Sequence, residues 1–546
     1  MYRIVSIALT VLLIVGTCGF AKTYLLPDYY EESDFLFSTP SVAGDGLGTY
    51  FNPAAWGMVE GPELQFIWDD QPVGNLDNTS SSRFVTSGSG GMFFGMKYND
   101  YLDSGDGNRK NMTDYQIGMS SGNKGSRFGW AYGWSSGDIS DNMPRGRTLS
   151  LGMVKRSYRY FSGGIAGKWV LSGGGGFQSV VDFGARPLGN EIVTFFADAS
   201  MRNTHSFRNI QWSAGALIEP VAGISIHGKF FRNYMQGNSF LAGLSLSVSG
   251  VRATTTPHFD SSDGHAYNSY GVRVGLPTRD YITESFLSNR AYLNLRFNQQ
   301  IKYQRYKLFD SGGHTLMELL ELLEEVKNDS RISGLAITIT EEMSGTWEMI
   351  WEVREKIKDV QSTDKKVVVF LERGGMRQYY LASVADRLMV DPVAYVAMMG
   401  FNMGRTYYRN MLDKYGVGID EWRFFKYKSA AEGLSRTGMT DADREQRHAL
   451  IEGFYETLRA DICESRDITH DEFDHIVNNV SVLNADSLLT YNLIDTTGRP
   501  DKISELIEYF EEDDKKQINR KVYSAMSYRS NEWGLSPQVA VIYALG

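Results

Sequence analysis

The fold of the first half of this chain is decided by a stretch of alternating side chains, Ile210-Gln211-Trp212-Ser213-Ala214-Gly215-Ala216-Leu217-Ile218. Every second residue of this stretch falls on one face of an extended segment, and that face is apolar. The alternation recurs at residues 224–230, after the break at Glu219-Pro220, and again at 244–248. Period-two alternation over segments of strand length, bounded by Gly, Asn and Pro, predicts antiparallel β-strands.

The same character extends over residues 41–280, which are rich in Gly, Ser, Asn and aromatic residues. Segments of about ten residues suit strands that cross an outer membrane at a tilt, and roughly ten to fourteen of them are expected. We therefore predict an antiparallel β-barrel, with a soluble β-sandwich as the alternative. Aromatic residues near the expected strand ends fit interfacial girdles; they include Trp130, Trp134, Tyr158, Tyr160, Phe230 and Phe231.

The first residues have the features of an export signal. Arg3 precedes an apolar stretch from Ile4 to Val15, and Gly19-Phe20-Ala21 offers small residues for cleavage. Residues 1–21 are therefore expected to be a signal peptide, with a lipid anchor at Cys18 or a retained membrane anchor as alternatives.

The composition of the chain argues against several classes of protein function and structure. A formal net charge of −10 gives no support to nucleic-acid binding, which needs a basic face. The mean hydropathy of −0.30 excludes a bundle of membrane helices but is compatible with a barrel whose inward residues are polar. Cys463 is the only cysteine after Cys18, so no internal disulfide and no cysteine-based metal site are expected in the cleaved chain.

A different pattern begins between Pro277 and Leu316. The residues from Thr315 to Glu318 read as a capping box in front of a helix with one apolar face. Strands and helices then alternate, which predicts βαβ units around a mostly parallel sheet and makes residues 290–510 an α/β domain. The expected strands lie at 334–339, 366–371 and 388–390, and the expected helices at 347–360, 379–385 and 408–415.

Two segments of this region carry a specific motif. One is Phe424-Phe425-Lys426-Tyr427-Lys428-Ser429-Ala430-Ala431-Glu432, and the other, upstream, is Gln378-Tyr379-Tyr380-Leu381-Ala382-Ser383-Val384-Ala385-Asp386. Together they resemble the first repeat of the signal peptide peptidase A (protease IV) family, and residues 334–337, 485–489 and 492–495 fit the same repeat. At the other end of the chain, residues 41–44 and 51–54 are similar to the opening of outer-membrane barrels of the long-chain fatty-acid transporter type.

The peptidase resemblance implies a crotonase-like (ClpP-like) α/β fold and a serine–lysine dyad in which Lys428 is the general base. A lysine accepts a proton from serine only when its amine is neutral, and desolvation favours the neutral form. We expect Phe424, Phe425 and Tyr427 to supply apolar walls around it. Ser429 is expected to orient Lys428 or to cap the next helix.

The expected nucleophile is missing from this repeat. The family's nucleophile-bearing repeat has a serine in a Gly-rich stretch before a helix, whereas residues 374–380 contain none. The repeat therefore resembles the lysine-donating one, and its serine is expected beyond Gly546. Residues 511–536 are then expected to be a linker and 537–546 the start of a second repeat, and the 546-residue chain is expected to be inactive by itself.

The expected function is that of an exported serine endopeptidase that cleaves hydrophobic peptides, such as signal-peptide remnants. The barrel is expected in the outer membrane, the peptidase part in the periplasm, and the split dyad favours a homo-oligomer. The alternatives are a non-catalytic barrel protein with a degenerate scaffold or interaction domain, and a small-molecule porter with a protease-like appendage. No cofactor is expected, and the spacing of His470 and His475 does not favour a metal site.

Overall fold

A computed structural model describes residues 26–27, 29–59, 61–71, 80–102, 107–138, 145–171, 176–203, 210–233, 237–260, 264–287, 290–305, 314–526, 528, 531–535, 540 and 542. The chain divides into a barrel unit, Met1–Phe286 with Met526–Gly546, and an α/β unit, Leu287–Ala525. The α/β unit is thus inserted in sequence into the barrel unit. The expected signal peptide, residues 1–21, lies outside the described residues, as does most of the segment 537–546.

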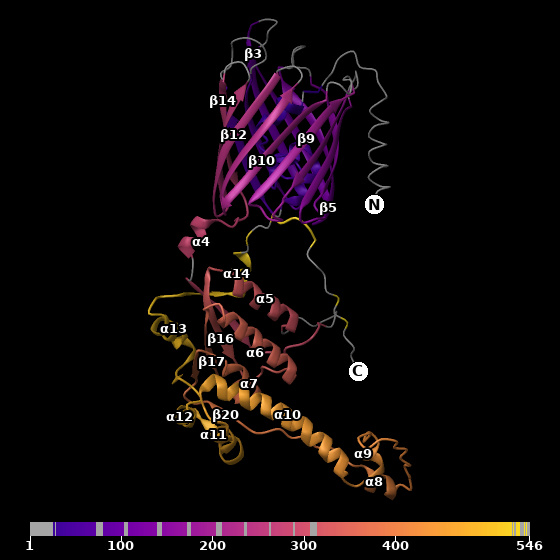
Figure 1. Ribbon diagram of the computed structural model, residues 1–546, viewed down its shortest axis with the longest axis vertical. Helices are drawn as coiled ribbons and strands as arrows, with labels where there is room; N and C mark the ends of the chain where they lie inside the picture. Colours follow the sequence, from indigo (N-terminus) through magenta and orange to yellow (C-terminus); the bar gives the residue numbers. More distant parts are fainter. Residues whose placement is uncertain are drawn as a thin grey trace. The chain divides into compact units, whose positions relative to one another are not determined.

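Fourteen antiparallel strands of the described chain close into one barrel (Figure 1). Each strand pairs with the next along the chain, and β14 returns to β1, with Leu64 opposite Val274 and Asp69 opposite Ser269. The predicted barrel is confirmed, and the sandwich alternative is wrong. The strands are β1 Glu63–Asp69, β2 Ser80–Ser89, β3 Met92–Leu102, β4 Arg109–Asn123, β5 Ser126–Gly137, β6 Thr148–Lys155, β7 Phe161–Val170, β8 Phe177–Ala185, β9 Val193–Arg202, β10 Gln211–Val221, β11 Ile224–Asn233, β12 Gly237–Val248, β13 Val251–Asp260 and β14 Gly264–Val274.

The barrel wall is polar inside and apolar outside. In β1, Glu63 and Gln65 are buried, while Leu64 and Phe66 are 50% and 40% exposed. The other strands show the same alternation of buried polar and exposed apolar side chains. The buried polar residues include Lys97, Asn99, Asp114, Gln116, Asp182, Asp198 and Lys229. The exposed apolar residues include Phe94, Ile117, Met119, Phe128, Trp130, Phe183, Phe195 and Leu244.

Phe231 departs from the expected aromatic girdle. It is buried inside the barrel unit in a cluster with Tyr30 and Leu241. Phe230 and Phe231 are consecutive in β11, so their side chains point to opposite faces of the wall, and only one of them can face outward.

Short helices fill the interior of the barrel: α2 Tyr29–Glu32, η1 Ser33–Phe35, α3 Gly46–Phe51 and η2 Pro53–Met58 (Figure 1). We call residues 26–58 the plug. Inward side chains of the wall hold its backbone, because Lys229 Nζ donates to Leu36 O (3.2 Å), Ser41 N donates to Asp182 Oδ1 (2.8 Å) and Gly46 N donates to Glu63 Oε1 (2.6 Å). The strands therefore begin at Glu63 and not near residue 41, and the filled interior gives the porter alternative no support.

The two rims of the barrel differ in their connections. At one rim, which we call the turn rim, strands are joined by as few as two residues, as between Ser89 and Met92 or Val248 and Val251. At the other rim the connections have between three and ten residues, with ten between Asp69 and Ser80. β14 ends at the turn rim and leads into α4, Tyr281–Leu287, so the chain leaves the barrel there.

A parallel sheet of six described strands forms the core of the α/β unit, in the order β22-β19-β17-β16-β15-β23. Its central strands are apolar because both faces are covered, as where Val368 and Phe370 pack with Ile507 of α13. The predicted βαβ pattern is confirmed. The strands are β15 Ala291–Phe297, β16 Ile332–Ile339, β17 Lys366–Leu371, β19 Arg387–Val390, β22 Thr496–Thr497 and β23 Lys516–Asn519, beside a small sheet of β18 Gly374–Gly375, β20 Tyr395–Ala397 and β21 Val482–Asn484.

The helices of the α/β unit begin with the predicted capping box, in which Thr315 and Glu318 bond reciprocally at the start of α5. β23 and α14 fall within the predicted linker 511–536, so this part of it is structured and belongs to the α/β unit. No helix in the described ranges has the length and hydropathy that crossing a membrane requires. The helices are α5 Leu316–Asn328, α6 Trp347–Gln361, α7 Met376–Ala382, α8 Arg409–Lys414, α9 Glu432–Ser435, α10 Asp441–Arg466, α11 His470–His475, the π-helical η4 Ile476–Val480, α12 Ala485–Thr490, η5 Pro500–Lys502, α13 Ile503–Glu511 and α14 Arg520–Ala525.

Candidate active site

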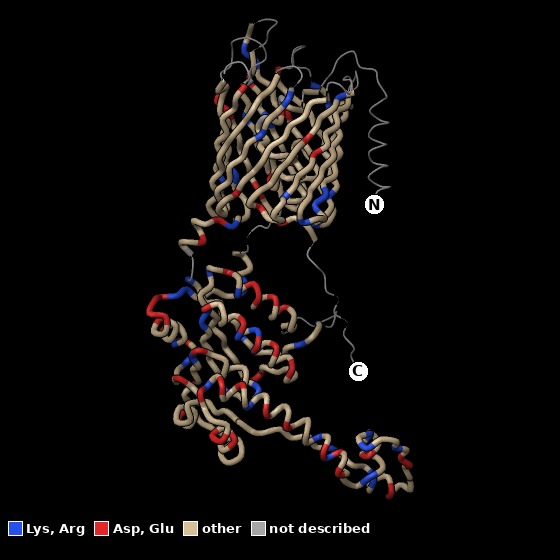
Figure 2. The backbone as a smooth tube through the Cα atoms, in the orientation of Figure 1, with Lys and Arg blue, Asp and Glu red and all other residues tan. Residues whose placement is uncertain are grey.

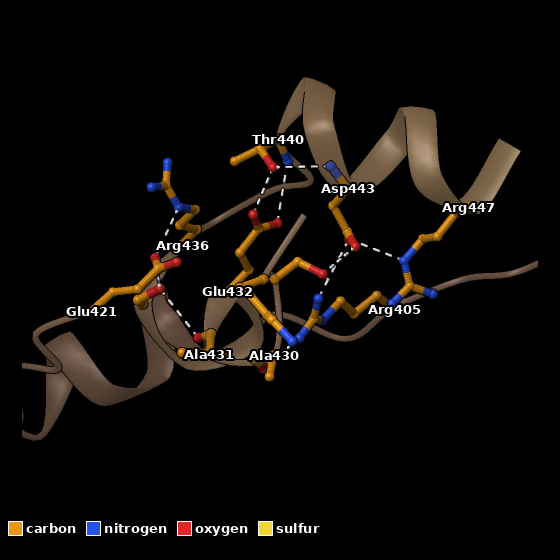
Figure 3. Close-up of polar contacts among 12 residues, drawn as sticks. Arg405, Glu421, Ala430, Ala431, Glu432, Arg436, Thr440, Asp443 and Arg447 are labelled. Carbon is orange, nitrogen blue, oxygen red and sulfur yellow. Dashed lines mark hydrogen bonds and ion pairs between the residues drawn. The ribbon is translucent and has the colours of Figure 1, made fainter. Parts of the chain in front are cut away.

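Lys428 lies in the connection between α8 and α9, just before the long helix α10. Both short helices lie at the N-terminal end of α10 (Figure 1). We call residues 402–450 the arm. Since α8 buries none of its residues, the conformation of this region depends on polar contacts, which Figure 3 shows in detail.

Glu432 is the fully buried acceptor of the arm. Its carboxylate accepts hydrogen bonds from the Arg423 guanidinium, from Thr440 Oγ1 (2.6 Å) and from Thr440 N (3.4 Å). Burial alone would raise the pKa of this carboxyl, but the hydrogen bonds from Thr440 and Arg423 outweigh burial and hold the pKa below its ordinary value. Glu432 is therefore a charged anchor that fixes the start of α9 to the start of α10.

Asp443 is a second buried carboxylate, in the first turn of α10. It accepts from Ser429 Oγ (2.7 Å), Arg447 Nε (3.0 Å) and Arg405 Nη1 (3.4 Å) (Figure 3). Burial again acts to raise the pKa of the carboxyl, and the contacts with Ser429, Arg447 and Arg405 outweigh it, so the pKa lies below its ordinary value.

Two of the three arginines that meet these carboxylates also hold the backbone around Lys428. Arg423 Nε donates to Lys428 O (2.9 Å), and Arg405 Nη2 donates to Ala430 O (2.6 Å). The main chain at the lysine and just after it is thus fixed by charged groups, which is how a reactive side chain can be placed on a loop.

Ser429 does not cap the helix that follows, so the capping interpretation is wrong. The N-cap of α9 is Ala431, and the Ser429 hydroxyl instead donates to Asp443. Two residues separate Ser429 from the first residue of α9, which is too far for an N-cap serine to reach the first turn. The contact with Asp443 leaves the orienting role as the proposal for Ser429.

The side chain of Lys428 is exposed, and the expected apolar walls do not form within the described residues. Phe424 and Phe425 are 79% and 72% exposed, and Tyr427 turns its hydroxyl to Glu445 Oε1 (2.8 Å). The physical reason is that the arm has no core of its own to draw these rings inward. Aromatic neighbours in sequence therefore do not by themselves desolvate a lysine.

The start of α7, where the other repeat of the family has its serine, has a structural role here. Gly375 is the N-cap residue, and its N–H donates to Gln378 Oε1 (3.0 Å). Gln378 Nε2 donates in turn to Met343 O (2.8 Å) and Glu341 O (3.2 Å), which fixes the loop before α6. The nearest serine along the chain, Ser383, follows the far end of α7 and is buried against Arg354 and Tyr380 O.

Comparison with known proteins decides the family of this region. Residues 359–512 match the peptidase family S49. The α/β unit carries a peptidase S49 domain. The match includes the whole arm and α7, and it confirms the resemblance to the signal peptide peptidase A family.

Three curated relatives align with parts of the chain. The serine protease SPPA, chloroplastic, of Arabidopsis thaliana is 25% identical over 263 residues, which are 46% of this chain and 38% of that protein. Protease 4 of Salmonella typhi is 25% identical over 29% of this chain and 25% of its own length, and Protease 4 of Haemophilus influenzae is 24% identical over 27% and 24%. The aligned parts thus span well under half of each relative.

The carboxylate network was missed by sequence reasoning, although one signal for it was present. Thr440 precedes Asp441 and Asp443, and threonine before acidic residues is a helix-start pattern. Contacts of Asp443 with Ser429 and Arg405 join segments that no local pattern connects. Elsewhere in the described ranges, no cluster of His, Cys, Asp and Glu could hold a metal ion, and His470 and His475 lie at the two ends of α11.

Proposed function

We propose that this protein is a cell-envelope serine peptidase of the signal peptide peptidase A type that hydrolyses hydrophobic peptides. Lys428 acts as the general base for a serine that a second, nucleophile-bearing repeat supplies. The observation that carries the proposal is the pair of buried carboxylates, Glu432 and Asp443, which hold the loop around Lys428 within the region that matches peptidase family S49. The test is the loss of peptide hydrolysis on replacing Lys428 with alanine.

The chemistry follows from an amine that accepts a proton. Neutral Lys428 takes the proton of the serine hydroxyl as the oxygen attacks the peptide carbonyl, and an acyl-enzyme forms when the resulting ammonium protonates the leaving amine. Water then attacks the ester, with the lysine again as the base, and the serine is restored. The amine must be desolvated for this, so a surface outside the described arm has to cover Lys428 in the working enzyme.

We propose that association with another subunit supplies the surface that covers Lys428. The arm exposes Trp422, Phe424, Phe425 and Tyr415 at 72–87% of their surfaces, which is costly in water for so many aromatic rings in one segment. Aromatic residues are enriched at the centres of protein interfaces. A nucleophile-bearing repeat of a neighbouring subunit is the cover that we propose for this surface, and it brings the serine to the lysine.

The full-length protein is expected to be an oligomer whose dissociation removes activity, because the dyad forms only across this interface. Replacing Trp422 and Phe425 together with serine should lower the molar mass measured by light scattering and lower peptide hydrolysis in parallel. Replacing Tyr509, which is 82% exposed on α13 outside the arm, serves as the control and should change neither. A fully active monomer would rule out the shared site.

We propose the outer membrane as the location of the barrel, with the S49 domain on the periplasmic side. A barrel that lies in a lipid membrane has an apolar outer wall and can have a polar interior, as this barrel does. Figure 2 shows few charged residues on the strands between the two rims. Short turns are typical of the periplasmic rim of such barrels, and β14 ends at the turn rim.

The protein is therefore expected to fractionate with outer membranes and to migrate faster in gels before boiling than after it, since a closed barrel resists detergent until heated. Extraction by detergent but not by alkaline carbonate is the accompanying result. Recovery in the soluble periplasmic fraction without detergent would contradict the membrane placement.

A non-catalytic scaffold is the second candidate, and the exposed side chain of Lys428 together with the serine-free start of α7 favours it. A scaffold predicts that peptide hydrolysis is absent from the purified full-length protein at all protein concentrations. The peptidase predicts hydrolysis that depends on Lys428, so a single activity measurement separates the two.

A further inference from the structure

The short segment Asn531–Leu535 follows the α/β unit in sequence but belongs to the barrel unit. Its contacts lie at the turn rim: Gly534 N donates to Arg156 O (2.8 Å), in the connection from β6 to β7, and Arg186, just after β8, donates from Nη1 to Asn531 O (2.7 Å). The chain therefore returns to the rim from which it left after β14.

Trp533 is the centre of this contact. Its side chain is only 5% exposed and packs with Val42 of the plug and Phe196 of β9. The Arg186 guanidinium lies 4.0 Å from the ring centroid and that of Arg156 5.9 Å, so the ring is in reach of two cations. Cation–π contacts of this kind are strongest when the pair is desolvated, as it is here.

The backbone around the tryptophan is equally specific. Gly534 has a φ of +97°, and a Cβ at this position would meet the Arg159 backbone at 3.1–3.2 Å. Only glycine fits that combination of left-handed backbone and close approach without strain. Before the tryptophan in sequence, Asn531 accepts a hydrogen bond at Oδ1 from Arg156 Nη1 (3.3 Å).

Arg156 ties this segment to the plug as well. Its Nε donates to Ser41 O (2.6 Å) and its Nη2 to Ala43 O (2.7 Å). The receiving site is therefore built jointly from the wall and from the plug, and it exists only in a barrel with the plug in place.

We infer that residues 531–535 form a latch that docks on the turn rim of the barrel, with Trp533 as its anchor. The occupant of this rim site is the chain's own segment. The S49 domain is then joined to the barrel through both of its chain ends instead of one. This inference does not depend on peptidase activity.

Crosslinking within the full chain tests the latch. The Leu535 Cγ lies 3.2 Å from the position of a Cβ at Gly125, so cysteines at these two positions are in reach of a short bismaleimide. Cys18 and Cys463 are replaced with alanine, and a protease site is placed between Leu287 and Arg290. After crosslinking and cleavage, the latched chain should run as one full-length band on a denaturing gel, whereas the uncrosslinked chain gives two fragments.

Trp533→Ala and Gly534→Val should each lower the crosslinked fraction at least about tenfold, the effect of losing a desolvated anchor. The matched control replaces the cysteine at 125 with one at Leu102, at the opposite rim roughly 30 Å along the strands, and should give no full-length band. Heat-modifiable migration confirms that each variant has a folded barrel. Equal crosslinking with Trp533→Ala, or equal crosslinking from Leu102, would overturn the latch.

Discussion

Replacing Lys428 with alanine is expected to lower peptide hydrolysis by the full-length protein about 10²–10⁴-fold, the usual contribution of a general base. In the proposed mechanism this side chain makes the serine nucleophilic. It does not build the fold, since it is exposed and its loop is held through backbone oxygens by Arg423 and Arg405. The measurement is the initial rate on a fluorogenic hydrophobic peptide, with the tryptic digestion pattern as a check on folding.

Lys426 offers a matched control two residues away. It is also exposed and forms an ion pair with Glu445 at 2.7 Å, so Lys426→Ala removes the same charge from the same loop. An exposed pair of this kind contributes little, and the rate is expected to stay within about twofold of the wild type. If the two variants hydrolyse peptide equally well, Lys428 is not the base.

Replacing Glu432 with alanine is expected to release the arm and to abolish hydrolysis with it. Arg423 and Thr440 lose the acceptor that holds them, and Arg423 is the residue that fixes Lys428 O. Arg423 and Thr440 are partly buried, and donors of this kind left without an acceptor destabilise a structure, so trypsin should cut within the arm at least about tenfold faster. Glu445→Ala removes an exposed carboxylate from the same arm, and we expect neither rate to change. A Glu432→Ala arm that resists trypsin as the wild type does would contradict the anchoring role.

Low pH is an independent test of the anchoring role of Glu432 and Asp443. The folded-state pKa values of Glu432 and Asp443 lie below their ordinary values of 4.5 and 3.8. The stability that they contribute is therefore complete above those ordinary values and is lost as the pH falls through the lower folded-state values. Cleavage of the arm by pepsin should therefore begin to rise as the pH falls below about 4.5, where the contribution of Glu432 starts to be lost, and should rise further below about 3.8, where that of Asp443 follows.

Sequence reasoning was reliable where local chemistry determines the structure. Lys366–Leu371 is a strand with the bounds that the apolar run predicted, and the capping box at Thr315 starts α5. Alternation in β10 and β11 predicted barrel strands because each wall residue faces one of two environments. The same alternation did not say which face was inside, and Phe231 was therefore placed on the wrong side.

The contacts that hold the plug and the arm could not be predicted from the sequence, and the physical reason is the same for both. The plug is held by Lys229, Asp182 and Glu63, which lie far along the chain from the residues that they bind. The loop of Lys428 likewise depends on Asp443, whose contact with Ser429 does not follow from the aromatic residues beside the lysine. Long-range polar contacts leave no periodic trace in a sequence.

The pairing of β1 with β14 sets the order in which this barrel can fold. These are the first and last of its strands along the chain, so the ring stays open until everything from Glu63 to Val274 has emerged. Closing the ring without the plug would leave the inward groups of Asp182 and Lys229 without the backbone partners that they have in the native state. We therefore expect the N-terminal helices to be enclosed as the ring closes, so that the first residues of the unit take their places together with its last strand.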